Sequence, residues 1–253
     1  MIPYFVLNQF NLGPITLYAW GLFVGLGFSA GYLLLLYSAK QKNLALEKVV
    51  GLALAIFLGG ALGSKILPVA LLPGGFFNNI NLLFSQHSGS MFMGGLLGAI
   101  LFVRGYIKLA RLNFWEMVDL LVLPTALGIA IGRIGCILIN DHQGAVTSLP
   151  WGILWPDGVL RHPVGVYEFL VGLALFGIFW WGKKGLLDRL ENSGFLFLLF
   201  LMSCSVIRFL LDFTRESQGL LADPCWGIFS ISQWVAVIIF VTSSALFIYK
   251  KKC

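Results

Sequence analysis

Charged side chains are scarce in this 253-residue chain. Aspartate, glutamate, lysine and arginine together make up 11% of it, against about 25% in an average soluble domain. Hydrophobic residues account for 58%, and the chain has 30 glycines besides. Such a chain has too few polar groups to cover a surface in water. This excludes a soluble enzyme, a disordered tail and, despite the net charge of +6, a nucleic-acid-binding domain.

The chain also lacks paired cysteines and charged residues near its start. The four cysteines, Cys136, Cys204, Cys225 and Cys253, form no CxxC pair and have no spacing typical of metal ligands. We therefore expect neither a disulfide framework nor a zinc site. Residues 1–14 carry no charged side chain. Because no basic segment precedes the first apolar run, we expect no cleavable signal peptide and a first helix that is retained.

Apolar runs of about 20 residues, the length that crosses a bilayer, fill most of the chain. Charged or Pro/Gly-rich breaks separate seven of them, approximately Ile15–Ser38, Val49–Leu72, Ser90–Leu109, Trp115–Ile139, Pro163–Trp181, Gly194–Phe213 and Gly227–Tyr249. The predicted fold class is therefore all-α: a polytopic integral membrane protein with seven transmembrane helices. We expect residues 1–253 to form a single membrane domain.

Basic residues alternate between the two sides of these spans. Three follow or close each of the first, third, fifth and seventh spans: Lys40, Lys42, Lys48; Arg104, Lys108, Arg111; Lys183, Lys184, Arg189; and Lys250, Lys251, Lys252. The opposite side has only Arg161 and Arg215. Since cytoplasmic loops carry the excess of Lys and Arg, the N-terminus is predicted outside and the C-terminus in the cytoplasm. The outer loops 140–162 and 214–226 are then the only expected places for a small extramembrane structure.

Ionisable residues inside the predicted spans are the candidates for a functional site, because they are costly there unless they pair or line a polar cavity. They are Lys65, Asp119, Arg133, Glu168, Arg208 and Asp212. Arg133 lies in GIAIGRIGC, whose glycines, Gly132 among them, let a headgroup or a neighbouring helix approach. Arg208 and Asp212 share one helical face, and Arg215 follows about two turns after Arg208.

These arginines suggest a site for an anionic lipid headgroup. A guanidinium binds phosphate through two parallel hydrogen bonds and stays charged when desolvated. A simpler alternative is that Arg208 and Asp212 neutralise each other, and that Arg133 pairs with Glu168 or Asp119 to fix helix packing. For the glycines of GLFVGLGFSAG and FLGGALG, helix packing is the favoured interpretation.

Five motifs around these residues resemble the prolipoprotein diacylglyceryl transferase family of the bacterial inner membrane. GRIGC (132–136), with Gly144 and TSLPWGI (147–153), resembles the family's central signature and the stretch that follows it. RHPVGVYE (161–168) resembles RHPxQLYE, and RFLLDFTRE (208–216) resembles RFxxEFxRE. SMFMGGLLG (90–98) resembles SFHGGLLG, and FSISQW (229–234) is similar to the closing segment.

The resemblance implies transfer of the diacylglyceryl group from phosphatidylglycerol to the lipobox cysteine of a prolipoprotein signal peptide, with release of glycerol phosphate. It implies a multi-pass protein of the bacterial cytoplasmic membrane, in contact with membrane lipids, that needs no metal or dissociable cofactor. By the matching positions, Arg133 would bind the phosphate or glycerol headgroup and Arg208 would assist the leaving group. Asp212 and Arg215 would hold that side of the cavity, and the signature glycines Gly132 and Gly144 belong to the substrate-binding set.

The chain departs from the family pattern at four positions. Met93 stands where the family has the histidine of FHGG, and Asp141 matches the glutamate of the central signature. Trp20 replaces a tyrosine of the first helix, and Asp212 replaces the glutamate of RFxxE. Loss of the histidine removes the family's candidate base.

His142 is a possible substitute for that base. An imidazole beside the carboxylate of Asp141 accepts a proton near pH 6.5, or somewhat higher if the carboxylate stabilises the cation. The alternative is that Asp141 and His142 only cap the helix or order the outer loop. His162 is expected to be a structural loop residue, and His87 to be solvated.

Two other function classes remain open at this point. The first is a non-catalytic phospholipid-binding or lipid-moving relative of the family, which the loss of the histidine at Met93 favours. The second is a small-solute transporter, which buried ion pairs favour but which explains neither RHPVGVYE nor TSLPWGI, and no internal repeat supports it.

Overall fold

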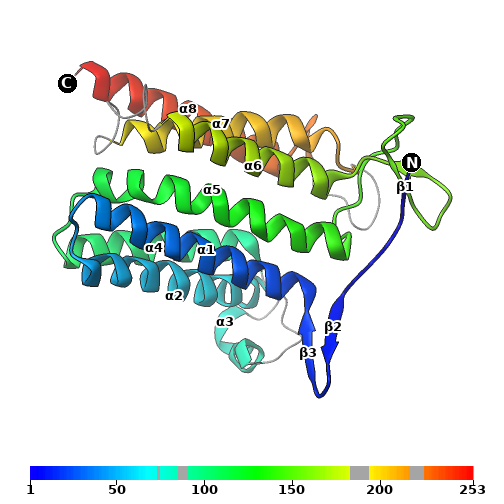
Figure 1. The fold of residues 1–253 in the computed structure, drawn as a ribbon, viewed down its shortest axis with the longest axis horizontal. Coiled ribbons are helices and arrows are strands. Elements are labelled where there is room, and N and C mark those ends of the chain that lie inside the picture. The colour runs from blue at the N-terminus through cyan, green and yellow to red at the C-terminus, as the bar shows by residue number, and fades with distance from the viewer. Residues whose placement is uncertain (73–74, 85–90, 183–193, 217–224, 253) are drawn as a thin grey trace. The chain divides into compact units, whose positions relative to one another are not determined.

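The computed structural model describes residues 1–72, 75–84, 91–182, 194–216 and 225–252. These contain seven helices of 18 residues or more: α1 (Ala19–Gln41), α2 (Leu46–Leu71), α4 (Phe92–Leu109), α5 (Phe114–Ile139), α6 (Val164–Gly182), α7 (Phe195–Asp212) and α8 (Ile231–Lys252) (Figure 1). Between α2 and α4 lie the short α3 (Gly75–Asn78) and the 3-10 helix η1 (Ile80–Phe84). All of these helices except α3, η1 and α4 are long and apolar enough to cross a membrane, which makes six candidate spans. The prediction of a mostly helical, multi-pass membrane protein is confirmed.

The first and last predicted spans began too early. Ile15–Tyr18 is strand β3, which pairs antiparallel with β2 (Gln9–Leu12), and α1 begins only at Ala19. Gly13, with φ of +63°, and Pro14 form the turn between these strands. At the other end, Gly227 lies in the turn of the hairpin β6 (Cys225–Trp226) and β7 (Phe229–Ser230), so α8 begins at Ile231. The hairpin β2–β3 is thus a structured segment outside the long helices that lies in neither of the two expected loops, 140–162 and 214–226.

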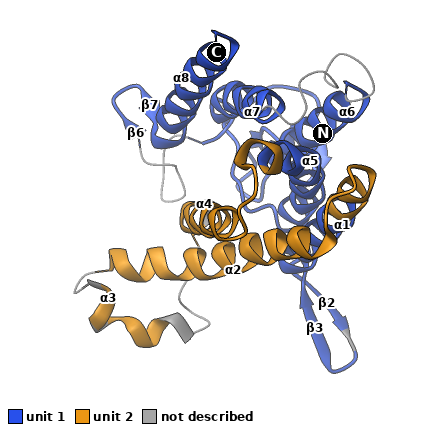
Figure 2. Cartoon of the chain, turned by 90° about the vertical axis from the view of Figure 1, so that its left-hand side faces the viewer, with its two compact units in different colours: residues 1–34, 118–253 blue, residues 35–117 orange. Residues whose placement is uncertain are grey.

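The described chain forms two compact units, residues 1–34 with 118–253 and residues 35–117 (Figure 2). In the second unit α2 packs against α4 through glycines that leave the backbones in direct contact. An added Cβ on Gly63 would collide with the carbonyl oxygen of Gly94, and one on Gly98 with that of Gly59. Helix packing was the predicted role of the glycines in FLGGALG, and at Gly59 and Gly63 it is confirmed.

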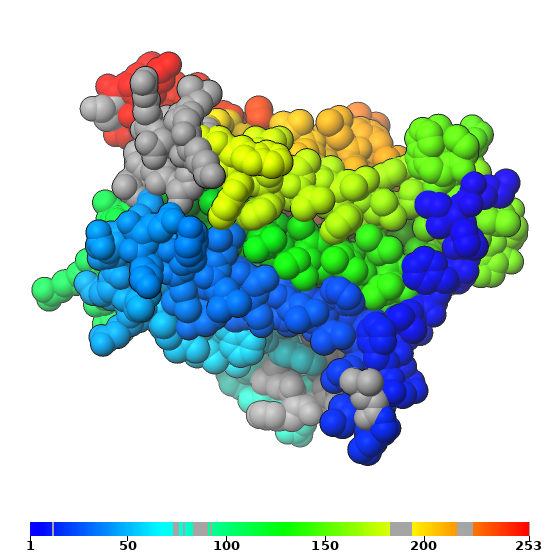
Figure 3. Space-filling view, in the orientation of Figure 1, coloured from blue at the N-terminus to red at the C-terminus, as the bar shows by residue number. Residues whose placement is uncertain are grey.

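The core of the first unit lies where α5, α6 and α7 meet. Its buried members are Val122, Leu123, Ala126, Leu175, Phe179, Leu196 and Phe200. Figure 3 shows the side chains of α6, in yellow-green, lying against those of α5, in green. On the opposite face of α6 large apolar side chains are exposed, Ile178 to 61% and Trp181 to 74%. Exposed apolar surface of this extent suits contact with lipid rather than water.

Asp119 has a structural role at one end of this unit. Its carboxylate accepts hydrogen bonds at the start of α7, from the backbone N–H groups of Gly194 (2.7 Å), the residue before the helix, and Phe197 (2.8 Å). Because the N-terminal N–H groups of a helix have no partners within it, a buried carboxylate there stabilises the helix. Of the two acids considered as partners of Arg133, Glu168 and Asp119, it is Glu168 that forms the ion pair, at 2.7 Å.

A small sheet closes the other end of the unit. Strand β1 (Ile2–Pro3) runs parallel to β4 (Ile153–Leu154), which pairs antiparallel with β5 (Leu160–Arg161). The N-terminus lies at this end of the helices and the C-terminus at the opposite end (Figure 1). The end of α5 and the beginning of α6 lie at this same end of the unit (Figure 1).

Candidate functional site

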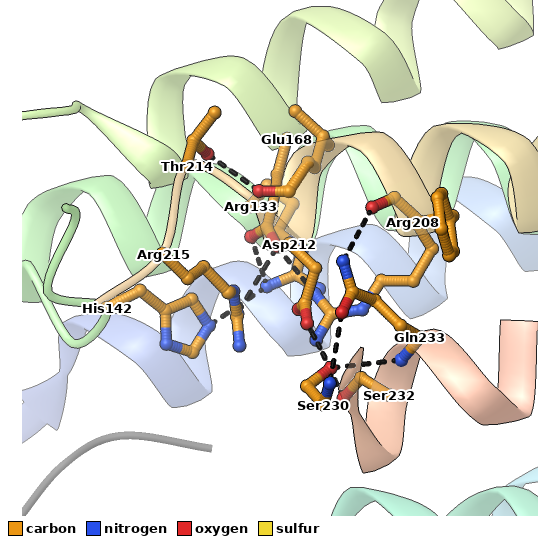
Figure 4. A network of polar contacts seen from close by, with 12 residues as sticks. Arg133, His142, Glu168, Arg208, Asp212, Thr214, Arg215, Ser230, Ser232 and Gln233 are labelled. Carbon is orange, nitrogen blue, oxygen red and sulfur yellow. Dashed lines mark hydrogen bonds and ion pairs between the residues drawn. The ribbon is translucent and has the colours of Figure 1, made fainter. Parts of the chain in front are cut away.

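Glu168 is the centre of a polar cluster in the first unit (Figure 4). It lies in the second turn of α6, and its side chain is 6% exposed. Nη1 of Arg133, on α5, is 2.7 Å from its Oε2. Its Oε1 is 3.3 Å from Nη1 of Arg208, on α7, and 3.3 Å from Nη2 of Arg215, just after α7. Three guanidinium groups, far apart in the sequence, therefore share one buried carboxylate.

A second carboxylate supports Arg208. Oδ1 of Asp212 is 3.2 Å from Nη2 of Arg208, one helical turn away, and Ser230 donates a short hydrogen bond to Oδ2. Nη2 of Arg208 also donates to Oγ of Ser232 (3.1 Å). Ser230 and Gln233 bond each other at the start of α8, each side chain accepting from the other's backbone N–H at 3.0 Å. The start of α8 thus fixes the face of α7 that carries Arg208 and Asp212.

The segments that follow α5 and α7 join beside Arg215. Gly144 and Arg215 form an isolated antiparallel bridge, and the N–H of Ala145 donates to the carbonyl of Thr214 (2.9 Å). An added Cβ on Gly144 would collide with the carbonyl oxygen of His162. Only glycine fits this position without moving the backbone of His162, so Gly144 helps to determine where the Arg215 backbone lies.

A separate ion pair holds the same junction. Nη1 of Arg161 is 2.6 Å from Oε2 of Glu216, and its Nη2 is 3.0 Å from Oδ2 of Asp157. The guanidinium also donates to the carbonyl of Gly144 (3.4 Å). These contacts link β5 to the segment that follows α7, next to the arginine cluster.

His142 contacts the cluster through Arg133, whose Nη1 is 3.3 Å from its Nε2. A guanidinium only donates, so Nε2 accepts and the ring proton is on Nδ1, which faces Oδ1 of Asp141 at 3.7 Å. Burial, and next the nearby Arg215, lower the pKa of His142 from its ordinary value, against a smaller opposite effect of Asp141. The expectation of a pKa near 6.5 or somewhat higher is therefore wrong: Asp141 raises the pKa, but burial and Arg215 outweigh its effect.

The structure brings most of the predicted site residues together. Arg133, Arg208, Asp212 and Arg215 belong to one network, His142 and Asp141 border it, and Gly144 positions Arg215. Gly132 is not required by close packing in the way that Gly144 is, because an added Cβ there would meet nothing within 4 Å.

Several other residues singled out in the sequence have different surroundings. Gly128 and Gly135 pack on α1 through Gly27 and Trp20, the helix-packing alternative. Nδ1 of His162 is 3.2 Å from the hydroxyl of Tyr167, consistent with a structural loop residue. Met93 and Lys65 belong to the second unit. His87 lies outside the described residues, as do Lys183, Lys184, Arg189 and Cys253.

The central role of Glu168 was not predicted from the sequence. It was expected at most as a partner of Arg133, whereas it is the shared partner of three arginines. Ser230, Ser232 and Gln233 were also missed as network members, although they belong to the FSISQW motif. Two signals pointed to them: an acid inside an apolar helix, and polar side chains at a helix start.

Fold and site together define a multi-pass helical membrane protein with a buried arginine–carboxylate cluster at one end of its helices. The family model described as prolipoprotein diacylglyceryl transferase matches residues 8–249. The chain belongs to this family.

Relatives from several bacteria match nearly the whole chain. A protein of Bordetella avium is 31% identical, with 97% of this chain and 95% of that protein covered. One from Coxiella burnetii is 32% identical, over 86% of this chain and 85% of its own length. One from Pseudomonas paraeruginosa is 28% identical, over 94% and 91%. All three are named phosphatidylglycerol–prolipoprotein diacylglyceryl transferase.

Proposed function

We propose that this chain transfers the diacylglyceryl group of phosphatidylglycerol to the thiol of the lipobox cysteine in a prolipoprotein signal peptide. In this reaction a carbon–sulfur bond forms at the terminal glycerol carbon of the diacylglyceryl group, and the bond from that carbon to the phosphate oxygen breaks. The thiol loses its proton, and glycerol phosphate leaves. Family membership supports this proposal, and so does the chemistry of the site.

The observation that carries the proposal is the convergence of Arg133, Arg208 and Arg215 on Glu168. A reaction that expels a phosphate needs positive charge where the negative charge develops. Guanidinium groups provide it through paired N–H donors that match phosphate oxygens. The side chains of Arg133 and Arg208 are 29% and 31% exposed, so both are within reach of a ligand.

The carboxylates fit the other half of the headgroup. Oε2 of Glu168 and Oδ1 of Asp212 are buried. Each forms an ion pair, Glu168 with Arg133 and Asp212 with Arg208, but neither oxygen accepts a hydrogen bond within the described part of the chain. A buried carboxylate oxygen is a strong acceptor for a hydroxyl. In our proposal the arginines take the phosphate and these oxygens accept from the glycerol hydroxyls, which favours phosphatidylglycerol over lipids without a polyol.

His142 is the proposed base, beside Asp141. Its lone pair on Nε2 is engaged by Arg133. When a phosphate draws Arg133 toward itself, Nε2 is released next to the bound lipid and accepts the thiol proton. Substrate binding and activation of the nucleophile are coupled in this way through one guanidinium.

We also propose seven membrane-crossing helices, with α4 as the seventh, the N-terminus outside and the C-terminus in the cytoplasm of a bacterial cell, in its inner membrane. The termini at opposite ends of the first unit support this topology. So do Lys250, Lys251 and Lys252 in the last turn of α8. The cluster around Glu168 then faces the outer side, where a secreted substrate arrives.

The test uses the purified protein in vesicles with phosphatidylglycerol and a lipobox peptide. We expect one diacylglyceryl group on the peptide cysteine by mass spectrometry and one glycerol phosphate per turnover. Arg133→Ala should abolish the reaction while leaving the protein folded, whereas Arg104→Ala, an exposed arginine of α4, should not. Binding of phosphatidylglycerol without transfer would identify a lipid-binding relative and refute the proposal.

A further inference from the structure

Three side chains of metal-binding type meet at the C-terminal end of α5. Sγ of Cys136, a carboxylate oxygen of Asp141 and a ring nitrogen of His142 all lie within 4.8 Å of one another. Cys136 is 6% exposed, whereas Asp141 and His142 have side chains about 30% and 28% exposed. The group is thus anchored in the protein and open on one side, as an entry path for an ion requires.

The backbone explains why residues with unremarkable spacing come together. Helix α5 ends at Ile139, and Asn140 has φ of +52°, in the left-handed region. Its N–H donates to the carbonyl of Cys136 (2.9 Å). This left-handed turn reverses the chain, so Asp141 and His142 fold back over the last helical turn, which carries Cys136.

The chemistry of the three groups selects the class of ion. Thiolate, imidazole and carboxylate are the ligands of zinc, and three protein ligands leave a fourth position for water. A thiolate and a carboxylate balance the charge of a divalent cation. The negative end of the α5 dipole lies at the same place and favours a cation there.

We propose that Cys136, Asp141 and His142 form a binding site for a zinc-class divalent cation. The expectation from cysteine spacing alone was that no zinc site exists, because that spacing carries no information about a turn that folds back. The site is distinct from the Glu168 cluster but adjoins it through one residue.

That residue is Arg133. Its Nη1 is 3.3 Å from Nε2 of His142 and 3.7 Å from Sγ of Cys136. The guanidinium thus contacts two of the three proposed ligands, and a metal ion binds them only if these contacts break. Because like charges repel at this range, occupation by the metal and the present position of Arg133 exclude each other. Metal binding is expected to inhibit the reaction proposed above, and this consequence alone rests on the proposed function.

Cobalt(II) is a suitable probe, because a cobalt–thiolate bond gives a charge-transfer absorption band. This band disappears when zinc displaces the cobalt. We expect this band in the purified full-length protein. Cys136→Ser should abolish it, and His142→Gln should weaken metal binding by at least the about 10- to 100-fold that loss of a ligand's hydrogen-bond partner costs, because it removes a ligand. Cys204→Ser is the matched control and should leave the band unchanged. Arg133→Gln should tighten metal binding, since it frees two ligands.

A second measurement does not depend on a variant. Zinc should protect Cys136 of the unaltered protein from alkylation by a small thiol reagent, with the modified cysteine identified by mass spectrometry. Absence of the cobalt band, its persistence in Cys136→Ser, or alkylation of Cys136 at the same rate with and without zinc would overturn the proposal. None of these readouts requires transferase activity, so failure of this inference and failure of the proposed function are distinguishable.

Discussion

Arg133 and Glu168 form the shortest ion pair of the arginine cluster, 2.7 Å between Nη1 and Oε2, and they connect α5 to α6. Because Arg208 and Arg215 contact the other oxygen of the same carboxylate, Glu168 holds three positive charges close to one another. Removing one member of such a buried charge network leaves the others uncompensated.

Glu168→Gln should therefore destabilise the protein and abolish transfer. The glutamine keeps the size of the side chain but removes the charge, which we expect to cost about 3–5 kcal/mol of unfolding free energy. Thermal unfolding in detergent measures the stability, and the peptide assay measures the activity. Glu216→Gln is the control, because it breaks an ion pair of similar length with Arg161 outside the cluster. Equal effects of the two substitutions would contradict the central role of Glu168.

The two glycines of the substrate-binding set should respond in opposite ways. Gly144→Ala should lower Tm and activity together, because its Cβ collides with the His162 carbonyl and shifts the bridge to Arg215. Gly132→Ala should be tolerated and should stabilise the helix by about 0.5–1 kcal/mol, since an added Cβ meets nothing and alanine favours the helix. A fully active Gly144→Ala variant, or an inactive but folded Gly132→Ala variant, would reverse these assignments.

The sequence predicts the helices better than it predicts contacts such as those of these two glycines. The lengths of the apolar runs placed seven helices to within a few residues at most ends, because bilayer thickness determines that length. The runs did not separate strand β3 from α1, since Ile15 and Leu17 are as apolar as the helix that follows. The roles of Glu168 and Gly144 depend on contacts between segments far apart in the chain, and one sequence without its fold does not give those contacts. The turn at Asn140, which brings His142 close to Cys136, is local, and it was missed because residue spacing alone does not show where the helix ends and the chain folds back.

His162 should contribute to the dependence of stability on pH. Burial lowers the pKa of its imidazole from the ordinary value. The unfolded chain therefore binds a proton more readily than the folded one, and stability falls as the pH decreases through about 6.5. Replacing it in His162→Gln should reduce the loss of Tm between about pH 7 and about pH 5. The pKa of His142 is lowered as well, but His142 is present in both the unaltered protein and the His162→Gln variant, so the comparison isolates His162. An unchanged loss of Tm would show that His162 is not the group that titrates.

Topology is open to chemical labelling in intact cells. A cysteine introduced at Gly158, in the outer loop between β4 and β5, should react with a membrane-impermeant thiol reagent from outside. A reporter fused after Lys252 should behave as cytoplasmic. The background is a protein in which the exposed Cys225 is replaced by serine, because this native cysteine reacts from the outside in the proposed topology. The opposite labelling pattern would place the arginine cluster on the wrong side for a secreted substrate.

The role of His142 is tested by separating the rate from substrate binding. His142→Gln keeps an acceptor oxygen for Nη1 of Arg133, so the headgroup site should stay intact and KM for phosphatidylglycerol should be unchanged. If His142 takes the thiol proton, kcat should fall by about 100- to 10,000-fold, the range that a positioned base contributes. A chelator in the assay keeps metal ions from masking the effect.

A loop-ordering role makes a different prediction for the same variant. Since His142 and Asp141 would then only stabilise the turn after α5, His142→Gln should lower Tm while the folded fraction keeps its full kcat. Met93→His in the His142→Gln background provides the reciprocal test, because it returns an imidazole to the position where the family has one. Partial recovery of kcat there would support the exchange of bases, whereas a normal rate in His142→Gln alone would leave the departing phosphate as the group that accepts the proton.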